Sequence, residues 1–323
     1  LFKVMANLTP SFSGRSYANF EMDAPGITLS PSGSNPVAID NLTITNGTFN
    51  FNMTGPLSGA HSIYGDITVQ SGAILNFNPS SAATITLQGA ALQNITINGT
   101  FNANTNANFK IAGPGGVSLN SDIAFNGNLE LAGGILHLGA ANLTLSTTSV
   151  ITGTPSASTM IAATGTGQLR KTFPAGFTGS YIFPVGDATG TPGYSPVTLN
   201  FTAGTFDPGN WTGVSLSNEK FPGDPNTTSY LNRYWNVGSL GITGFTCNAV
   251  FQYDPSDVSG TEDQIFSMQM IPAPFTSFGL VNSGLHQVTA PGLTAFGTFT
   301  GSQPAPSVIT LPASLIGATT ATL

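Results

Sequence analysis

The chain has 323 residues, of which 7 are Lys or Arg and 14 are Asp or Glu, so charged residues make up 7%, against about 25% in ordinary globular proteins. A composition that is 40% hydrophobic excludes disorder, which combines low hydrophobicity with high charge. The net charge of -7 argues against nucleic acid and anionic membrane surfaces as partners, because both need clustered cations. No stretch approaches the roughly 18 apolar residues of a spanning helix, so we expect no membrane insertion. The 39 Gly and 22 Pro residues favour an all-β chain rich in turns.

A short motif repeats through the first half of the chain. It opens with Asn or Asp, continues with alternating apolar and small residues, and recurs at intervals of 20 to 28 residues. The five copies are Asn41–Ile44, Asp66–Val69, Asn94–Ile97, Asp122–Phe125 and Asn142–Leu145. Repeats of this length, built from short strands separated by turns, are typical of a parallel β-solenoid in which each coil stacks on the previous one. We therefore predict a solenoid over residues 1–165.

The low charge is concentrated in this repetitive half. From residue 27 to residue 165 only 5 side chains are charged, whereas 16 of the 27 Asn residues lie between positions 41 and 142. Equivalent side chains of stacked coils lie about 4.8 Å apart, so repeated like charges would repel one another, while stacked amides can hydrogen-bond along the axis. A lysine at Asn94 or Asn98 is therefore expected to destabilise the coils. The expected structural ladder consists of Asn41, Asp66, Asn94, Asp122 and Asn142.

Composition changes after the repeats. From Gln168 to Gly301 there are 12 charged residues, and the glycine steps lose their period. Residues 194–201 and 245–253 alternate apolar and polar side chains, as strands with one buried face do. About eight strands are available in residues 166–302, which is typical of an immunoglobulin-like β-sandwich. Residues 303–323 are interpreted as a linker and the first strands of a following fibronectin-III or immunoglobulin-like module.

The cysteine content and the two ends of the chain bear on its setting. The single cysteine, Cys247, excludes an internal disulfide framework, and its place on the apolar face of a strand predicts an inert core thiol. The first residues lack the charged start, apolar core and cleavage site of a signal peptide, and the last residues end within an expected strand. We interpret the sequence as an internal piece of a longer polypeptide.

Several runs in the second half carry a resemblance to a known group of proteins. They are Gly165–Lys171, Tyr181–Gly186, Tyr194–Leu199, Leu231–Trp235, Phe251–Asp254 and Phe296–Phe299. Together they resemble a module common in long cell-surface proteins of Bacteroidota, including gliding-motility adhesins, and the Asn- and Gly-rich repeats resemble the segment that often precedes that module. The resemblance implies an extracellular, cell-surface location, export by the type 9 secretion system, and contact with the secretion translocon during export.

The expected function is structural: a non-enzymatic stalk or filament segment of a large secreted adhesin. Neighbouring modules of the same chain are its expected partners, with surface glycans or other cells as further candidates. A carbohydrate- or Ca²⁺-binding module is the first alternative, and a β-helix polysaccharide hydrolase or lyase is the second. A glycosidase needs two carboxylates about 5 to 9.5 Å apart, and Asp66 and Asp122 would be about 9.6 Å apart if two coils separated them. Asn occupies the same position in other repeats, which favours a turn role, so no catalytic residue is assigned.

Two groups of residues are candidates for ligand binding. Four carboxylates fall within ten residues of one another: Asp254, Asp257, Glu262 and Asp263. Carboxylates at loop spacing are suitable Ca²⁺ ligands, and Ca²⁺ is the one cofactor considered, with an acidic solvated loop as the alternative. Trp211 and Trp235 are candidate platforms for stacking a carbohydrate. For Trp235 the competing expectation is a core position, with Arg233 folded over it or paired to a carboxylate.

Overall fold

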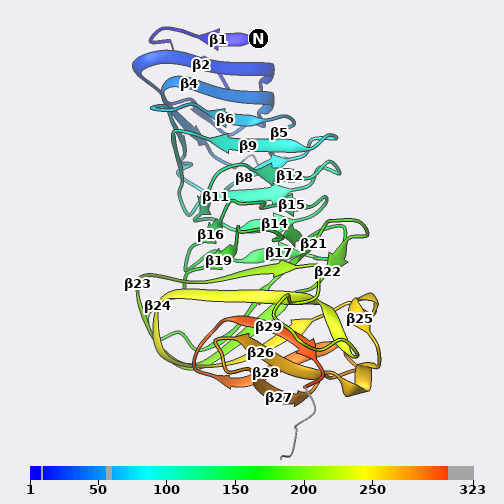
Figure 1. Ribbon diagram of the computed structural model, residues 1–323. Coiled ribbons are helices and arrows are strands. Elements are labelled where there is room, and N and C mark those ends of the chain that lie inside the picture. The colour runs from blue at the N-terminus through cyan, green and yellow to red at the C-terminus, as the bar shows by residue number, and fades with distance from the viewer. Residues whose placement is uncertain (9, 56–59, 305–323) are drawn as a thin grey trace, which may run out of the picture.

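The computed structural model describes residues 1–8, 10–55 and 60–304. The chain is nearly all β, with 57% of its residues in strands and about 2% in helix, and its first part is a parallel β-solenoid of about seven coils. The antiparallel strands of the second part stand at one end of this stack (Figure 1). The predicted fold class is confirmed. Residues 305–323, assigned above to a linker and a third module, lie outside the described residues.

Each coil contributes strands to three parallel columns. The long strands β2 (Ser16–Leu29) and β4 (Ala38–Met53) run through all three columns, β1 (Phe2–Val4) pairs with β2, and β3 (Ser32–Gly33) pairs with β4. The first column continues with β5 (His61–Ile63), β8 (Ala83–Leu87), β11 (Ala107–Ile111), β14 (Leu129–Leu131) and β17 (Ile151–Gly153). The second contains β6 (Ile67–Val69), β9 (Gln93–Ile97), β12 (Val117–Leu119), β15 (Leu136–His137), β18 (Ile161–Ala162) and β21 (Val185–Asp187). The third has two paired runs, β7 (Ile74–Phe77) with β10 (Thr100–Ala103), and β13 (Ile123–Phe125) with β16 (Leu143–Leu145) and β19 (Leu169–Lys171). Strands β10 and β13 are neighbours but belong to different sheets.

The solenoid core is a continuous stack of apolar side chains. Along most short strands the side chains alternate between buried and partly exposed, so every second residue faces the interior. Phe51, Phe77, Phe109 and Phe125 follow one another inside the stack, with ring centroids 5.3, 5.5 and 4.1 Å apart. These are distances at which aromatic pairs attract one another beyond simple burial. The phenylalanines therefore tie successive coils together along the axis.

Outward-facing amides form a ladder, as the asparagine content predicted. Asn50, Asn76 and Asn102 occupy equivalent positions of three coils. The Asn76 Nδ2 donates to the Asn50 Oδ1 at 2.7 Å, and the Asn102 Nδ2 donates to the Asn76 Oδ1 at 2.8 Å. The side chain of Asn98 makes no hydrogen bond within the described residues and is exposed at a turn. Asn98 therefore differs from the ladder residues, although the sequence led us to expect that a lysine at Asn98 would destabilise the coils as one at Asn94 would.

Two charged pairs of the solenoid consist of opposite charges on neighbouring coils. Lys110 and Glu130 are direct partners across β11 and β14, and the Lys110 Nζ lies 2.7 Å from the Glu130 Oε1. Lys3 lies opposite Glu21, with 3.0 Å between Nζ and Oε1, and its Nζ is 2.7 Å from the Asp23 Oδ2. Stacking that brings equivalent residues this close favours unlike charges and penalises like ones, in agreement with the low charge of this half.

The second part is a β-sandwich built around one long, bent hairpin. The strands β23 (Val197–Ser217) and β24 (Tyr230–Gln252) pair over most of their length, with register shifts near the middle. The other elements are β20 (Gly179–Phe183), β22 (Gly193–Tyr194), η1 (Pro255–Asp257), β25 (Val258–Ser259), η2 (Glu262–Gln264), β26 (Phe266–Ile271), β27 (Thr276–Leu280), β28 (Gln287–Leu293) and β29 (Thr298–Ser302). Strands β20 and β28 extend one half of the hairpin, while β29 and β26 extend the other. Phe251 and Phe299 pack between the halves with centroids 4.7 Å apart. Cys247 is buried, and burial raises the pKa of its thiol to about 12, as expected for an inert core thiol.

The two parts share backbone pairing instead of being joined by a linker. Strand β19 pairs in parallel with β16 of the preceding coil and antiparallel with β23 of the sandwich. Strand β21 continues the second column by pairing in parallel with β18. Parallel stacking therefore extends past residue 165, the boundary expected from composition. The reason is that the last coil already carries the charged side chains typical of the second part.

The amide ladder leads to a first prediction. Replacing Asn76 with Lys should lower the free energy of unfolding by roughly 1–3 kcal/mol. The substitution removes both ladder hydrogen bonds of Asn76, so the Asn50 Oδ1 and the Asn102 Nδ2 each lose their partner. The matched control is Asn98→Lys, which adds the same charge at an exposed turn and should change stability by less than about 0.5 kcal/mol. Urea unfolding of both variants measures the difference. Equal destabilisation by the two substitutions would contradict the ladder's contribution.

Candidate functional site

Three of the five expected ladder residues lie at one corner of successive coils. Asn41, Asp66 and Asn94 each come directly before second-column residues that pair in register from coil to coil. The Asn41 Oδ1 accepts a hydrogen bond of 2.7 Å from the backbone N–H of Asp66, and the Asp66 Oδ1 accepts one of 2.7 Å from the backbone N–H of Asn94. The side chains of Asn41 and Asp66 thus bind the backbone of the next coil, and the Asn94 Nδ2 donates back to the Asp66 Oδ1 at 3.3 Å. Side-chain hydrogen bonds therefore link these three residues from coil to coil.

Asp122 and Asn142 belong to a second ladder, so the prediction of one ladder of five residues was wrong. They precede the third-column strands β13 and β16, and Asp122 accepts hydrogen bonds of 2.8 and 2.9 Å from the backbone N–H and Nδ2 of Asn142. In the second column, the residue that pairs with Asn94 on the next coil is Ser118, and not Asp122. The sequence misleads here because both corners need a side chain that accepts a hydrogen bond from the next coil. Asn and Asp therefore open strands in both columns.

Asp66 and Asp122 consequently do not form the carboxylate pair that a glycosidase requires. They lie before strands of different columns, so the expected separation by two coils does not apply. Burial tends to raise the pKa of Asp122, but the hydrogen bonds from Asn142 and the charge of Arg170 outweigh it, and the pKa lies below its usual value. A carboxyl with a lowered pKa is poorly suited to donate a proton as a general acid.

Asp257, one of the four carboxylates considered for Ca²⁺, is buried against Arg233. The two residues are 4% and 2% exposed. The Arg233 Nε and Nη2 donate to the two carboxylate oxygens at 2.7 and 3.1 Å, which is the bidentate geometry of strong Arg–carboxylate pairs. Asp257 also accepts a hydrogen bond of 3.0 Å from the backbone N–H of Asp254. The expected pairing of Arg233 with a carboxylate is confirmed, and Asp257 is not a solvated loop residue.

The other carboxylates of this cluster do not share a common partner. Asp254 caps the short 3-10 helix η1 by accepting two hydrogen bonds, of 2.9 and 2.7 Å, from one residue of its first turn. The Glu262 Oε1 accepts from the Tyr253 hydroxyl at 2.6 Å and lies 2.8 Å from the His286 Nδ1. Asp263 is exposed. Within the described ranges, no three His, Cys, Asp or Glu side chains are grouped so that they could hold a metal ion.

The two tryptophans considered for carbohydrate stacking both have partners within the protein. Trp235 is 0% exposed, its ring lies 5.3 Å from that of Phe251, and its Nε1 donates to the Ser195 carbonyl at 3.1 Å. Trp235 therefore presents no exposed ring face on which a sugar could stack, so its assignment as a stacking residue was wrong and the competing core position is confirmed. Trp211 is partly exposed, but the Arg170 guanidinium lies 4.1 Å from its ring centroid in a cation–π contact.

A cleft opens beside the Arg233–Asp257 pair, close to the end of the solenoid, and is termed the junction cleft. Its volume is about 390 Å³. The lining residues come from four separate segments: Thr189–Gly193, Asn218, Asn232–Arg233 and the group Asp254, Ser256 and Asp257. The sequence drew attention to Arg233 and the carboxylates. It gave no signal for the threonines and asparagines, because only folding brings these segments together.

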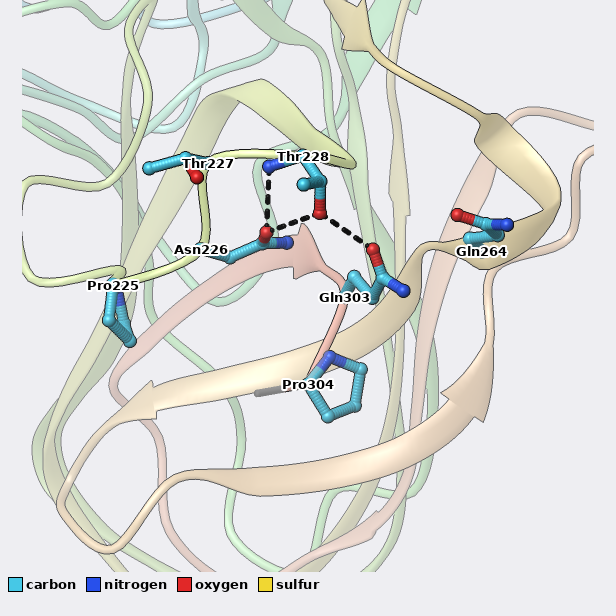
Figure 2. A pocket seen from close by; sticks show the side chains of 7 residues that line it. All are labelled: Pro225, Asn226, Thr227, Thr228, Gln264, Gln303 and Pro304. Atoms are coloured by element: carbon cyan, nitrogen blue, oxygen red, sulfur yellow. Dashed lines mark hydrogen bonds between the residues drawn. The ribbon is translucent and has the colours of Figure 1, made fainter. Parts of the chain in front are cut away.

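A second cleft, of about 520 Å³, lies at the end of the sandwich from which the chain continues, and is termed the terminal cleft. Figure 2 shows the seven side chains that line it, which are Pro225, Asn226, Thr227, Thr228, Gln264, Gln303 and Pro304. The Thr228 hydroxyl lies 2.8 Å from both the Asn226 Oδ1 and the Gln303 Oε1. Several polar groups of this cleft therefore already bind one another, and none of its lining side chains carries a charge.

No family model, curated protein or solved structure matches the chain. In the part of the chain that the structure describes, no helix has the length and hydropathy needed to cross a membrane.

A buried histidine provides a titratable group inside the solenoid. His61 is 1% exposed and lies in a column position that Ile85 and Phe109 occupy in the next coils. Its Nε2 is 2.9 Å from the Thr54 carbonyl oxygen, and its buried Nδ1 has no hydrogen-bond partner among the described residues. Burial lowers the pKa of His61, and the hydrogen bond to Thr54 offsets this only in part. Protonation would therefore place an unpaired N–H and a charge in the core.

The first prediction from this subsection concerns the buried ion pair. Replacing Asp257 with Asn should lower the stability of the sandwich by roughly 3–5 kcal/mol, because it leaves the Arg233 charge buried without a counter-charge. The control, Asp263→Asn, removes the same charge from the exposed part of the same loop and should be nearly neutral. Chemical denaturation measures both. A loss for Asp257→Asn no larger than that of the control would contradict a structural role for the pair.

The second prediction concerns acid sensitivity. Because the pKa of His61 is lower in the folded than in the unfolded chain, the unfolded state binds the proton first as pH falls. Stability should therefore be full above a pH of about 6.5, the usual histidine pKa, and decline as pH falls toward the lowered folded value. The variant His61→Leu should flatten this decline between pH 7 and about 5, as measured by unfolding at several pH values. An unchanged slope in the variant would assign the acid sensitivity to other groups.

Proposed function

We propose that this chain is a non-enzymatic segment of a long cell-surface adhesin, in which the solenoid and the sandwich together act as a stiff stalk. The observation that carries the proposal is the pairing of β19 with both β16 and β23. A strand that belongs to the last coil and also pairs with the sandwich leaves no free linker between the parts. Backbone hydrogen bonds then resist bending at the joint, whereas flexible linkers allow domains to move.

The interior of the solenoid supports the same proposal. Its coils are tied by three columns of parallel strands, by the phenylalanine stack, and by side chains at two corners that bind the next coil. Solenoids behave as quasi-one-dimensional stacks, whose length grows with the number of repeats while each repeat contacts only its neighbours. Such an architecture gives reach and stiffness without requiring an active site.

The proposed setting rests on the resemblance to long surface proteins of Bacteroidota. In that setting the chain is exported by the type 9 secretion system, lies outside the cell, and serves attachment or gliding as one module among several. Its partners are then the neighbouring modules, the translocon during export, and surface glycans or other cells. The low density of charge suits this role, because coils without repeated charge stack tightly.

The proposal is tested on the cells that make the protein. An antibody raised against this chain should label intact, unpermeabilised cells, and external protease should remove the signal. Deletion of the coding region should reduce attachment to surfaces at least several-fold, without affecting growth on polysaccharides. Signal that appears only after permeabilisation would overturn the proposed location.

A parallel assay tests the non-enzymatic part of the proposal. The purified chain is incubated with a panel of plant, algal and bacterial polysaccharides, and reducing ends and unsaturated products are measured. We expect no turnover. Turnover that Asp66→Asn or Asp122→Asn abolishes, while Asp263→Asn leaves it intact, would show instead that the chain is an enzyme.

A further inference from the structure

We propose that the junction cleft binds a neutral saccharide unit. The Arg233 side chain lines this cleft. Arg233 is 2% exposed, and its Nε and Nη2 are paired with Asp257, but its buried Nη1 has no hydrogen-bond partner among the described residues. A buried donor left without an acceptor is unfavourable, and more so when it is charged. An oxygen atom of a ligand in the cleft would satisfy this donor.

The Asp187 carboxylate, which points to the same side as Arg233, has a buried oxygen that accepts no hydrogen bond within the described residues. Asp187 is 0% exposed; its Oδ1 accepts hydrogen bonds from Thr189, but its buried Oδ2 has no partner within the described residues. Asp187 pairs with Gly193 across β21 and β22, and a Cβ on Gly193 would be 3.2 Å from the Arg233 Nη2. Directly paired residues of antiparallel strands point to the same face, so the Asp187 carboxylate points to the side on which Arg233 lies.

The charges near the cleft favour a neutral ligand over an ionic one. Asp257 neutralises Arg233, and Asp254 and Asp187 then leave an excess of negative charge. A phosphate, sulfate or uronate would be repelled by these carboxylates. A bound metal ion would need several converging ligands, and the described residues offer no group of three.

The remaining lining groups are those that recognise sugar hydroxyls. Thr191 supplies a hydroxyl, while Ser256, Asn218 and Asn232 each make one side-chain hydrogen bond within the protein and keep further donor or acceptor capacity for a ligand. Sugar hydroxyls have the same double capacity, so one hydroxyl can accept from an arginine while it donates to a carboxylate. None of the described residues that line the cleft is aromatic, which predicts recognition through hydrogen bonds and not through stacking. Its volume of about 390 Å³ lies near the lower end of ligand sites and fits a ligand of about one or two sugar rings.

The test uses the whole chain and probes of known chemistry. Saturation-transfer NMR and titration calorimetry are carried out with the methyl glycosides of glucose, galactose, mannose and N-acetylglucosamine, and with neutral disaccharides of the same sugars. Methyl glucuronide and inorganic phosphate serve as the anionic comparison. We expect at least one neutral glycoside to bind and neither anion to compete with it. Absence of binding by every neutral probe, or preferential binding of an anion, would overturn the proposal.

Two matched variants locate the binding. Thr191→Trp introduces a large side chain at an exposed position of the junction cleft, and should weaken binding by about tenfold or more, which corresponds to about 1.4 kcal/mol. Thr227→Trp makes the same change at an exposed position of the terminal cleft, and should leave affinity unchanged. Thermal melting checks that both variants fold. Loss of binding in Thr227→Trp alone, or equal affinity in all three proteins, would place the ligand elsewhere and refute the proposed site. The assay uses purified protein, so its result does not depend on the proposed role as a cell-surface stalk.

Discussion

The parallel pairing of equivalent residues in neighbouring coils is the interaction on which the rest of this structure depends. Each residue lies about one strand spacing from the equivalent residues of the coils above and below. A residue type that recurs at one position of the repeat therefore contacts its own copies on the neighbouring coils. Apolar residues then form a continuous core, amides form ladders, and charges are tolerated as opposed pairs such as Lys110 with Glu130. The composition of the first half follows from this one constraint.

The same constraint explains how the two parts are joined. A stack of coils ends in unpaired backbone groups, which invite association with other chains unless they are covered. Strand β19 of the last coil meets β23 of the sandwich, and the hairpin of β23 and β24 continues the pairing. The sandwich therefore covers part of the solenoid's end. The junction cleft lies next to this contact, where the loop after β21 approaches Arg233 of β24, so a ligand there would bind at the least repetitive part of the molecule.

The successes and failures of the sequence reasoning have one physical origin. The period and the alternation of apolar residues report local geometry, and they predicted the solenoid, the amide ladder and the sandwich. The motif that opens with Asn or Asp reports only that a corner needs an acceptor for the next coil. It could not distinguish the corner of Asp66 from the corner of Asp122, because side chains at both corners accept a hydrogen bond from the backbone of the next coil.

The sequence by itself determined the all-β class, the stacked coils and the approximate place where repeats give way to longer strands, because these depend on residue patterns within one or two coils. Only the tertiary structure decided that Asp257 is buried against Arg233, that Trp235 belongs to the core, and that loops far apart in the chain enclose a cleft. Those outcomes depend on contacts between distant segments. Such contacts are set by how the long hairpin bends and packs, which no local pattern of residues encodes.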